Sequence, residues 1–302
     1  MSDAPTAAGV DGFVLLDKPA GLTSQRAVTA VKRVVGAAKA GHAGTLDPAA
    51  TGLLVVGVGR GTRLLGYLSA ADKCYEATIR FGQATTTDDA EGTPLGTPAD
   101  ATGLTAAAIA DAAAAYTGVI DQVPSAVSAI KVDGRRAYDR VRRGEDVALA
   151  ARTVTVRHIG IVATRVVPPW FEADVTVECS SGTYIRALAR DLGRDLGVGA
   201  HLTGLRRTRV GGLDVADAAG LDTLGVWDVR DLYSMARLVA PLVEVDEAAA
   251  ADVSHGRPLA RTWPDDLVAV VAGGVVLGLY RRDPADPARA RAVVVFPPGE
   301  PR

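Results

Sequence analysis

The chain has 302 residues, of which 48% are hydrophobic, and a formal net charge of −2. It is long enough for one substantial core and a smaller satellite domain, while no apolar run reaches the roughly 18 residues of a membrane helix and the acidic N-terminus lacks the apolar segment of a signal peptide. We therefore expect a cytoplasmic globular protein without a membrane partner, and the two well-separated cysteines, Cys74 and Cys179, support neither a disulfide framework nor a zinc site.

The near-neutral net charge hides three basic segments. Residues 24–63 carry a charge of +5, and residues 131–157 and 186–209 carry +4 each. If these segments fold onto one face, that face can bind a polyanion while the rest of the chain stays acidic. For any one segment taken alone, an ordinary solvated surface is the better explanation.

The N-terminal part of the chain predicts a strand, a helix and a second strand. Residues 12–18 read GFVLLDK, an apolar run that predicts a short buried strand. Thr23 or Ser24 is the expected N-cap of a helix over residues 25–36. A glycine-rich loop follows, and GLLVVGVG at 52–59 predicts the next strand.

One acidic residue, Asp47, stands in that glycine-rich loop between Leu46 and Pro48. An Asp-Pro pair is typical of a helix start, with Asp as the N-cap and Pro at the first helical position. The alternative is a chemical role, in which a rigid loop with small side chains holds one carboxylate at a set angle in a pocket. This stretch alone leaves both interpretations open.

The middle of the chain mixes strands and helices. Residues 72–85 alternate apolar and polar side chains, which predicts a half-buried strand. In the polar loop that follows, Asp88, Asp89 and Glu91 have no recognised metal-ligand spacing, so we expect no metal site. The alanine-rich segment 105–118 predicts a helix.

Residues 122–150 predict an arm rather than a part of the core. The segment has many charges and few large apolar residues, with a turn at Asp133-Gly134 and a short arginine-rich helix around Tyr138. This composition suits an extension over a partner, and an exposed hairpin is the alternative.

The last third predicts two strands, at 152–164 and 171–184, and then a helix over 184–197. After residue 235 the chain predicts a small β-rich unit, in which the run 267–280 is interrupted by a Gly-Gly hairpin. Because no regular βαβ repeat is present, the elements favour an α+β fold with a mixed, largely antiparallel sheet.

The stretch GHAGTLDPAATGLL at 41–54 resembles the TruB family, the synthases that make pseudouridine at position 55 in the T-arm of transfer RNA. The family pattern Gly-His-x-Gly-x-Leu-Asp-Pro-x-Ala-Thr-Gly-x-Leu is met at each specified position. Further stretches match in the family's order and cover most of residues 12–210: LDKPAGLTS (16–24), KCYEATIRFGQATTTDDAEG (73–92), VPSAVSAIKVDGRRAYDRVRRGE (123–145) and SSGTYIRALARDLGRDLGVGAHLTGLRR (180–207).

The resemblance implies a role for each matching residue. Asp47 would be the catalytic aspartate, Tyr75 the aromatic side chain that packs on the target base, and Tyr184 and Arg186 would complete the pocket, with Arg186 paired to the aspartate. His42 would support the flipped-out conformation of the RNA loop.

The resemblance also implies a wall of the pocket, a set of RNA contacts and a domain plan. Leu205 would wall the pocket, and the arm at about 122–150 would be a thumb that closes over RNA. After a disordered segment at 1–11, the pseudouridine synthase fold would span 12–235, and a small PUA-like RNA-binding domain would span 236–302. The basic residues expected to contact RNA are Lys18, Lys131, Arg135, Arg136, Arg140, Arg142, Arg143 and Arg206.

The implied reaction fits the residues. Isomerisation of uridine needs no redox step, energy input or net water, so we expect no cofactor. A glycoside hydrolase would need two carboxylates, whereas one is expected here. A nearby arginine, Arg186, would keep Asp47 ionised in a buried pocket. Without the family, Tyr75 would be interpreted as core and Arg186 as part of a surface ladder with Asp191.

The main hypothesis is therefore a monomeric tRNA pseudouridine synthase that recognises the T-arm without a guide RNA or an obligate protein partner. The alternative is an RNA chaperone that folds tRNA with little catalytic output, for which neither Asp47 nor Arg186 is needed. A guide-RNA-dependent relative is disfavoured because the arm is present and a basic tail is absent. The sequence leaves open whether Asp47 adds to C6 of uracil, attacks C1′ or removes the 2′ proton.

Overall fold

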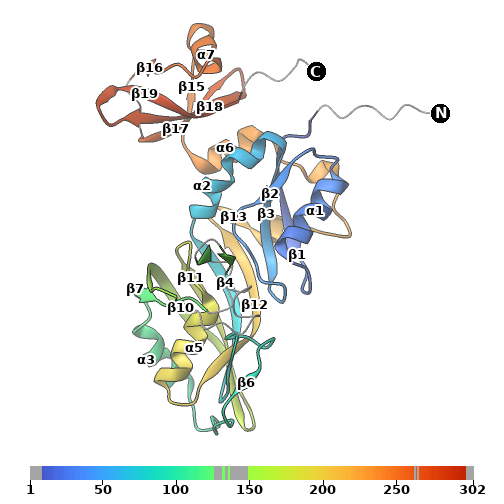
Figure 1. Ribbon diagram of the computed structural model, residues 1–302, viewed down its shortest axis with the longest axis vertical. Coiled ribbons are helices and arrows are strands. Elements are labelled where there is room, and N and C mark those ends of the chain that lie inside the picture. Colours follow the sequence, from blue (N-terminus) through green and yellow to red (C-terminus); the bar gives the residue numbers. More distant parts are fainter. Residues whose placement is uncertain are drawn as a thin grey trace, which may run out of the picture. The chain divides into compact units, whose positions relative to one another are not determined.

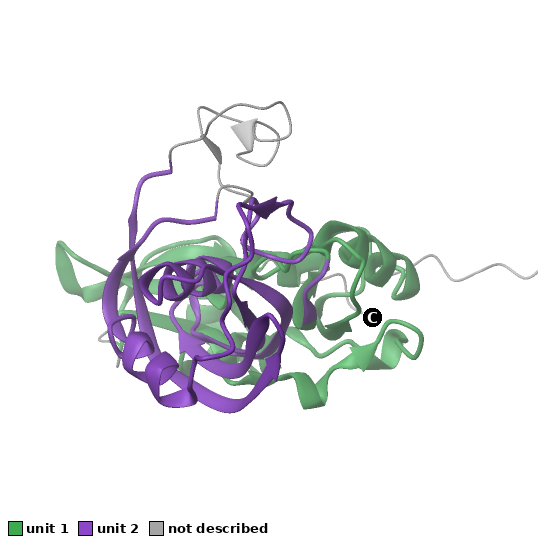
Figure 2. Cartoon of the chain, turned by 90° about the horizontal axis from the view of Figure 1, so that it is seen from below, with its two compact units in different colours: residues 1–48, 52–69, 211–302 green, residues 49–51, 70–210 purple. Residues whose placement is uncertain are grey.

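A computed structural model describes residues 9–125, 131–132, 135–136, 149–261, 263 and 265–296. The chain divides into two compact units (Figure 2). Unit 1 comprises Met1–Pro48, Gly52–Ser69 and Gly211–Arg302, and unit 2 comprises Ala49–Thr51 and Ala70–Val210. Over the described part of the chain, no helix has the length and apolar character needed to cross a membrane.

The sheet of unit 1 is built around two deeply buried strands. β1 (Gly12–Lys18) and β3 (Thr51–Val58) run antiparallel, and nearly all their side chains are buried. Such continuous burial is typical of strands that are covered on both faces. The short strand β14 (Ala219–Gly220) lies parallel to β1, and β2 (Ala40–His42) lies antiparallel to β3. The strands predicted at 12–18 and 52–59 are confirmed.

Helix α1 (Ser24–Val34) contacts β1 and β2 and buries Ala27, Val28 and Val31. Its N-cap is Thr23, whose Oγ1 accepts a hydrogen bond from the Arg26 amide at 3.2 Å. The remaining short elements before the C-terminal sheet are η1 (Gly59–Leu64), α2 (Leu65–Ala70), β13 (Leu213–Asp214), η2 (Val215–Asp217), η3 (Val226–Asp228) and α6 (Leu232–Val239).

The last part of unit 1 is a small sheet with the strand order β15-β17-β18-β19-β16. Its core contains the stacked rings of Trp263 and Tyr280, with centroids 6.4 Å apart. Gly273 and Gly274 have φ values of 55° and 78°, so they form the tight hairpin predicted between two strands. The elements are β15 (Leu242–Glu244), α7 (Glu247–Ser254), β16 (Leu259–Ala260), β17 (Leu267–Ala272), β18 (Val275–Asp283) and β19 (Asp286–Val295).

Unit 2 contains an antiparallel run in the order β12-β4-β11-β10-β7, and α3 and α5 pack on it and on each other (Figure 1). Two short strand pairs, β5 with β6 and β8 with β9, lie outside this run. The bounds are β4 (Lys73–Phe81), β5 (Ala84–Thr85), β6 (Pro94–Leu95), α3 (Ala106–Ala114), β7 (Gly118–Gln122), β8 (Lys131–Val132), β9 (Arg135–Arg136), β10 (Arg152–Val167), β11 (Trp170–Cys179), α5 (Ile185–Asp195) and β12 (Ala200–Val210).

Strand β4 shows how the two faces of this sheet differ. Tyr75, Ala77 and Ile79 are buried, whereas Glu76 and Thr78 between them are more exposed. This is the alternation predicted for residues 72–85. The α+β class with a mixed, largely antiparallel sheet is confirmed, because β1 with β14 and β15 with β17 pair in parallel, whereas the run β12-β4-β11-β10-β7 is antiparallel throughout. The domain boundary at residue 235 stays a prediction.

Candidate active site

The loop that carries Asp47 has a fixed backbone. Ser24 is 3% exposed, and its hydroxyl donates to the Leu46 carbonyl and accepts from the Leu46 amide, both at 2.9 Å. Leu46 is buried, Asp47 is half-buried and Pro48 is exposed. Since residues 43–50 form a loop that leads into β3 and not into a helix, the interpretation of Asp47 as a helix cap is wrong.

Lys18 closes the same loop from the end of β1. Its side chain is fully buried, and Nζ donates to the carbonyls of Pro19 at 2.9 Å, Leu22 at 2.8 Å and Pro48 at 3.2 Å. The Gly21 amide donates to the same Pro48 carbonyl at 2.8 Å. The expectation that Lys18 contacts RNA is therefore corrected: a buried ammonium with three carbonyl acceptors holds the backbone beside Asp47.

Replacing this ammonium is expected to destabilise unit 1. In Lys18→Met the three carbonyls lose their shared donor. Because buried acceptors without a hydrogen bond are costly, the free energy of unfolding should fall by roughly 1–3 kcal/mol. Chemical denaturation measures this change. Lys32→Met, on the exposed face of α1, is the control and should stay within about 0.5 kcal/mol. Equal stability of the two variants would contradict the role assigned to Lys18.

β2 places His42 in the same region of unit 1. His42 lies opposite Val56 of β3, and the next residue, Ala43, donates its amide to Val55 at 2.9 Å. Gly44 then has a φ of 94°, which side chains other than glycine rarely adopt. His42 and Asp47 are thus carried by one short backbone segment that is hydrogen-bonded on both sides.

In unit 2, Tyr75 lies on the buried face of β4 and is 8% exposed. The register places Arg207 of β12 and Val177 of β11 opposite it. Arg207 is 1% exposed, and Arg206 lies opposite Glu76, so it belongs to the other face of the sheet. Arg206 stays an expected RNA contact, and Arg207 is the arginine on the face of Tyr75.

A second buried cation lies on the same strand as Tyr75. Lys73 is 5% exposed and donates from Nζ to the Ala71 carbonyl at 2.6 Å. Burial and the neighbouring Arg207 guanidinium lower the pKa of Lys73 to about 8. Sequence reasoning missed this cation, because spacing along one strand does not reveal which groups the adjacent strand brings near.

Arg186 lies in the first turn of α5 and is 5% exposed. Its Nη1 donates to the Thr87 carbonyl at 2.8 Å and lies 3.2 Å from Asp89 Oδ2. The other oxygen of Asp89 accepts from the Glu91 amide at 3.0 Å. Arg186 is therefore not part of a surface ladder; Arg190 and Arg194 are the residues that pair with Asp191.

Tyr184 is the N-cap residue of α5, and the side chain of Gln122 fixes its backbone. Gln122 Nε2 donates to the Tyr184 carbonyl at 3.0 Å, and Gln122 Oε1 accepts from the Tyr184 amide at 2.8 Å. Gln122 is 3% exposed. No sequence pattern indicates Gln122 or Asp89 as partners of α5, since both pairings span more than sixty residues of chain.

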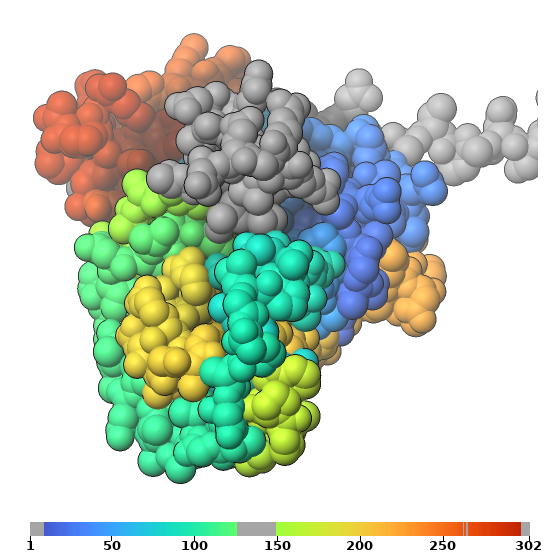
Figure 3. Space-filling model, turned by 60° about the horizontal axis from the view of Figure 1, so that its bottom comes forward, coloured from blue at the N-terminus to red at the C-terminus, as the bar shows by residue number. Residues whose placement is uncertain are grey.

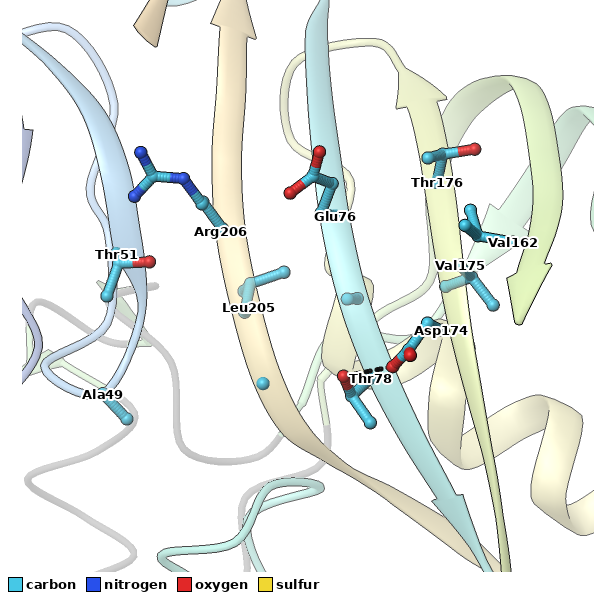
Figure 4. Close-up of a pocket in the computed structure, with 12 residues that line it drawn as sticks. Ala49, Thr51, Glu76, Thr78, Val162, Asp174, Val175, Thr176, Leu205 and Arg206 are labelled. Atoms are coloured by element: carbon cyan, nitrogen blue, oxygen red, sulfur yellow. Dashed lines mark hydrogen bonds between the residues drawn. The ribbon is translucent and has the colours of Figure 1, made fainter. Parts of the chain in front are cut away.

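A pocket opens on the exposed face of unit 2 (Figure 4). Arg206 and Glu76 stand on neighbouring strands there, and Thr78 donates from Oγ1 to Asp174 Oδ1 at 2.7 Å. Leu205 also lines it, while Tyr75 is absent from the lining. This pocket is therefore not the aromatic platform expected for the base.

The predicted arm is only partly within the described residues. Lys131, Arg135 and Arg136 lie on β8 and β9, which pair antiparallel on either side of the expected turn at 133–134. Arg140, Arg142 and Arg143 lie outside the described residues.

Two family models match the chain in succession. The TruB family pseudouridylate synthase N-terminal domain matches residues 32–185, and the tRNA pseudouridylate synthase B C-terminal domain matches residues 186–245. The first alone spans half of the chain. The chain belongs to the TruB family. The resemblance found in the loop around Asp47 is thereby confirmed, and the family's enzymes are isomerases.

Close relatives of this TruB family member extend over nearly the whole chain. A tRNA pseudouridine synthase B of Mycobacterium sp. (strain KMS) is 51% identical over 96% of this chain and 98% of its own length. The proteins of the same name from Cutibacterium acnes and Thermobifida fusca are 50% and 51% identical, over 94% and 95% of this chain and 98% of their own lengths.

Solved structures confirm the predicted fold. An H/ACA RNP bound to a substrate RNA containing 2′-deoxyuridine matches with a TM-score of 0.69 at 24% identity, covering 98% of this chain and 87% of the other. The archaeal box H/ACA sRNP Nop10-Cbf5 complex matches with a TM-score of 0.69 at 23% identity, covering 99% and 91%. The TruB family member thus has the pseudouridine synthase fold with a small β-rich C-terminal part.

Proposed function

We propose that the chain converts uridine 55 in the T loop of tRNA to pseudouridine, with Asp47 as the catalytic carboxylate. Membership of the TruB family supports the reaction, and the relatives' name, tRNA pseudouridine synthase B, supports the substrate. The observation that carries the role of Asp47 is the loop itself, in which Lys18 and Ser24 hold the backbone on either side of one half-buried carboxylate.

The reaction breaks the bond between N1 and C1′, turns the uracil and joins C5 to C1′. The proton on C5 is lost and N1 gains one, so no oxidant, reductant or water is consumed and no cofactor is required. A single carboxylate is enough for each of the three routes considered for Asp47. A rigid loop favours all of them, because a reacting group has to be held within a fraction of an ångström of its productive position.

The other expected residues supply a binding site for the extruded base. Tyr75 would stack on the uracil, a contact worth about 1–3 kcal/mol. Arg186, which is permanently cationic, would pair with Asp47 and keep it ionised; Tyr184, His42 and Leu205 would complete the enclosure. The burial of Arg186 and the anchoring of the Tyr184 backbone support a fixed pocket on unit 2. Extrusion of the target from its loop costs a few kcal/mol, which these contacts repay.

Helix α1 supplies uncompensated positive charge for the RNA backbone. Its exposed face carries Arg26, Lys32 and Arg33, and Lys39 follows in the next loop. Among the described residues, none of these four cations has a carboxylate at ion-pair distance, unlike Arg157, which binds Asp72 at 2.7 Å. These four cations, together with the basic residues expected in the arm and Arg206, favour contacts with RNA phosphates.

Neutralising two of these cations should weaken the salt dependence of tRNA binding. Arg26 and Arg33 lie seven residues apart on one face, and each phosphate contact contributes about 0.7–0.9 to the slope of log K against log salt. Arg26→Gln with Arg33→Gln should reduce the slope by about 1–2, as measured by filter binding. Arg157→Gln with Arg194→Gln removes the same charge from ion-paired positions and should leave the slope unchanged. A larger effect of the control pair would contradict this assignment.

The function is tested by tritium release from tRNA that carries 5-³H-uridine, with the purified chain and no other protein or guide RNA. We expect the release of label from one uridine per tRNA. We expect the enzyme to be a monomer and to act in the cytoplasm. A chaperone would bind and refold the tRNA without releasing label, and a guide-dependent enzyme would release label only when a guide is added.

A further inference from the structure

Two arginines of α5, one helical turn apart, form ion pairs with two adjacent aspartates of one tight turn in unit 2. Arg186 binds Asp89, and Arg190, one helical turn later, has its Nη1 3.3 Å from Asp88 Oδ2. Asp88 is held in the left-handed region with a φ of 61°, a conformation that Asp tolerates better than most residues. Figure 3 shows the segment that contains this turn (teal) beside the helix (yellow).

Arg190 also reaches a third segment. Its Nη2 donates to the Val123 carbonyl at 2.8 Å, just past the end of β7. In the preceding residue, Gln122, both polar atoms of the side chain bind the Tyr184 backbone. The guanidinium is itself oriented by Asp191, at 3.0 Å from Nε and 3.1 Å from Nη2. One side chain therefore ties the turn at 88–89 and the end of β7 to the helix that carries Arg186.

We propose that Arg190 is a positioning residue of the active site, which fixes the Asp88-Asp89 turn so that Asp89 orients Arg186. This inference rests on the proposed role of Arg186 in the pocket. Arg190 does not touch the substrate in this account; it acts through Asp88, whose main chain continues directly into Asp89. Because Arg186 has Thr87 and Asp89 as partners, any shift of residues 87–89 displaces its guanidinium.

Arg194 provides a matched control on the same helix. It lies four residues after Arg190, and its side chain is 65% exposed against 27% for Arg190. Its bonds go to Asp191, Asp195 and the Tyr116 hydroxyl, and none of them reaches the turn or Val123. Substitution of Arg194 removes an equal charge and comparable ion pairs from α5 without releasing the turn.

The main experiment is single-turnover kinetics with saturating enzyme. Arg190→Gln should slow pseudouridine formation about 10- to 100-fold, the effect of misplacing a reacting group by about 1 Å, while the Kd for tRNA stays within about twofold. Arg190→Lys should recover part of the rate, since it keeps a cation near Asp88, and Arg194→Gln should keep the wild-type rate. A wild-type rate for Arg190→Gln, or an equal loss in Arg194→Gln, would overturn the proposal.

The pH profile gives a readout that a merely structural role would not move. Burial raises the pKa of Asp88; the Ser125 hydroxyl, Arg190 and Arg186 oppose this, and Asp191 adds to it. Loss of Arg190 raises this pKa further, so the ionised carboxylate is lost at a higher pH as the solution is acidified. The acid limb of the rate profile should therefore move to higher pH in Arg190→Gln and stay in place in Arg194→Gln.

Hydrogen–deuterium exchange separates this inference from the proposed function, because it needs no activity. The Leu202 amide donates to the Asp88 carbonyl at 3.0 Å, and the Glu91 amide donates to Asp89 Oδ1. Both amides should exchange faster in Arg190→Gln and at the wild-type rate in Arg194→Gln. Unchanged exchange in Arg190→Gln would overturn the positioning role even if the wild type is active. Faster exchange in Arg190→Gln together with an inactive wild type would point to a failure of the proposed function alone.

Discussion

Asp47→Asn is expected to abolish pseudouridine formation and leave tRNA binding intact. The change keeps the size of the side chain and removes its charge, while Ser24 and Lys18 continue to hold the loop through backbone atoms. A positioned acid–base group contributes about 10²–10⁴-fold to a rate, and a covalent nucleophile contributes more. Single-turnover kinetics should therefore show a loss of at least about 10²-fold, with a Kd for tRNA within about twofold of the wild type.

A neighbouring acid shows whether this effect is specific. Asp17→Asn, on β1, changes the same kind of side chain in unit 1 and should keep most of the activity. If Asp47→Asn retains full activity while tRNA still binds, the catalytic assignment is wrong. If it loses binding and catalysis together, Asp47 contributes to the RNA interface and not to the chemical step.

Arg186→Lys is expected to be the second most damaging substitution. A lysine keeps the charge but cannot reach the Thr87 carbonyl and the Asp89 carboxylate with the planar geometry of a guanidinium. The cation would also be displaced from its proposed position beside Asp47, and loss of one well-placed electrostatic contact costs about 10²–10³-fold in rate. We expect a fall of this size in kcat with a small change in KM.

Arg194→Lys, on the exposed side of α5, is the matched control for this change and should keep the wild-type kcat. Thermal unfolding of both variants shows whether α5 is intact. A wild-type kcat for Arg186→Lys would contradict a role for the guanidinium in the pocket, since a lysine cannot reproduce the geometry of the guanidinium.

Local patterns in the sequence were sufficient for much of the fold. The apolar runs of β1 and β3, the cap at Thr23 and the glycine hairpin between β17 and β18 each depend on residues that are neighbours in the chain. The alternation along β4 likewise placed Tyr75 on a buried face. The motif around Asp47 identified the family because its spacing is long and specific.

The residues that fix the candidate site depend on contacts between distant segments, which periodicity does not encode. A lysine is usually a surface residue, yet the ammonium of Lys18 is buried and donates to three carbonyls from two turns. Asp89 and Gln122 were not singled out as partners of α5 for the same reason.

Strand β12 shows how one irregularity changes which residue faces the site. The pairing with β4 slips by one residue between Leu202 and Gly204. Without this bulge Arg206 would lie opposite Tyr75, and with it Arg207 takes that place. A slip of one residue exchanges the two faces of a strand, so the sequence alone could not decide between two adjacent arginines.

Site-resolved mapping of the modified nucleotide shows whether this chain alone converts uridine 55 of tRNA. Unmodified tRNA is incubated with the purified chain, treated with a carbodiimide that marks pseudouridine, and read by primer extension. We expect one stop, which maps to position 55, approaches one modification per tRNA with the wild type and is absent with Asp47→Asn. No stop with the wild type, or a stop that maps to another uridine, would show that the chain alone is not a uridine-55 synthase.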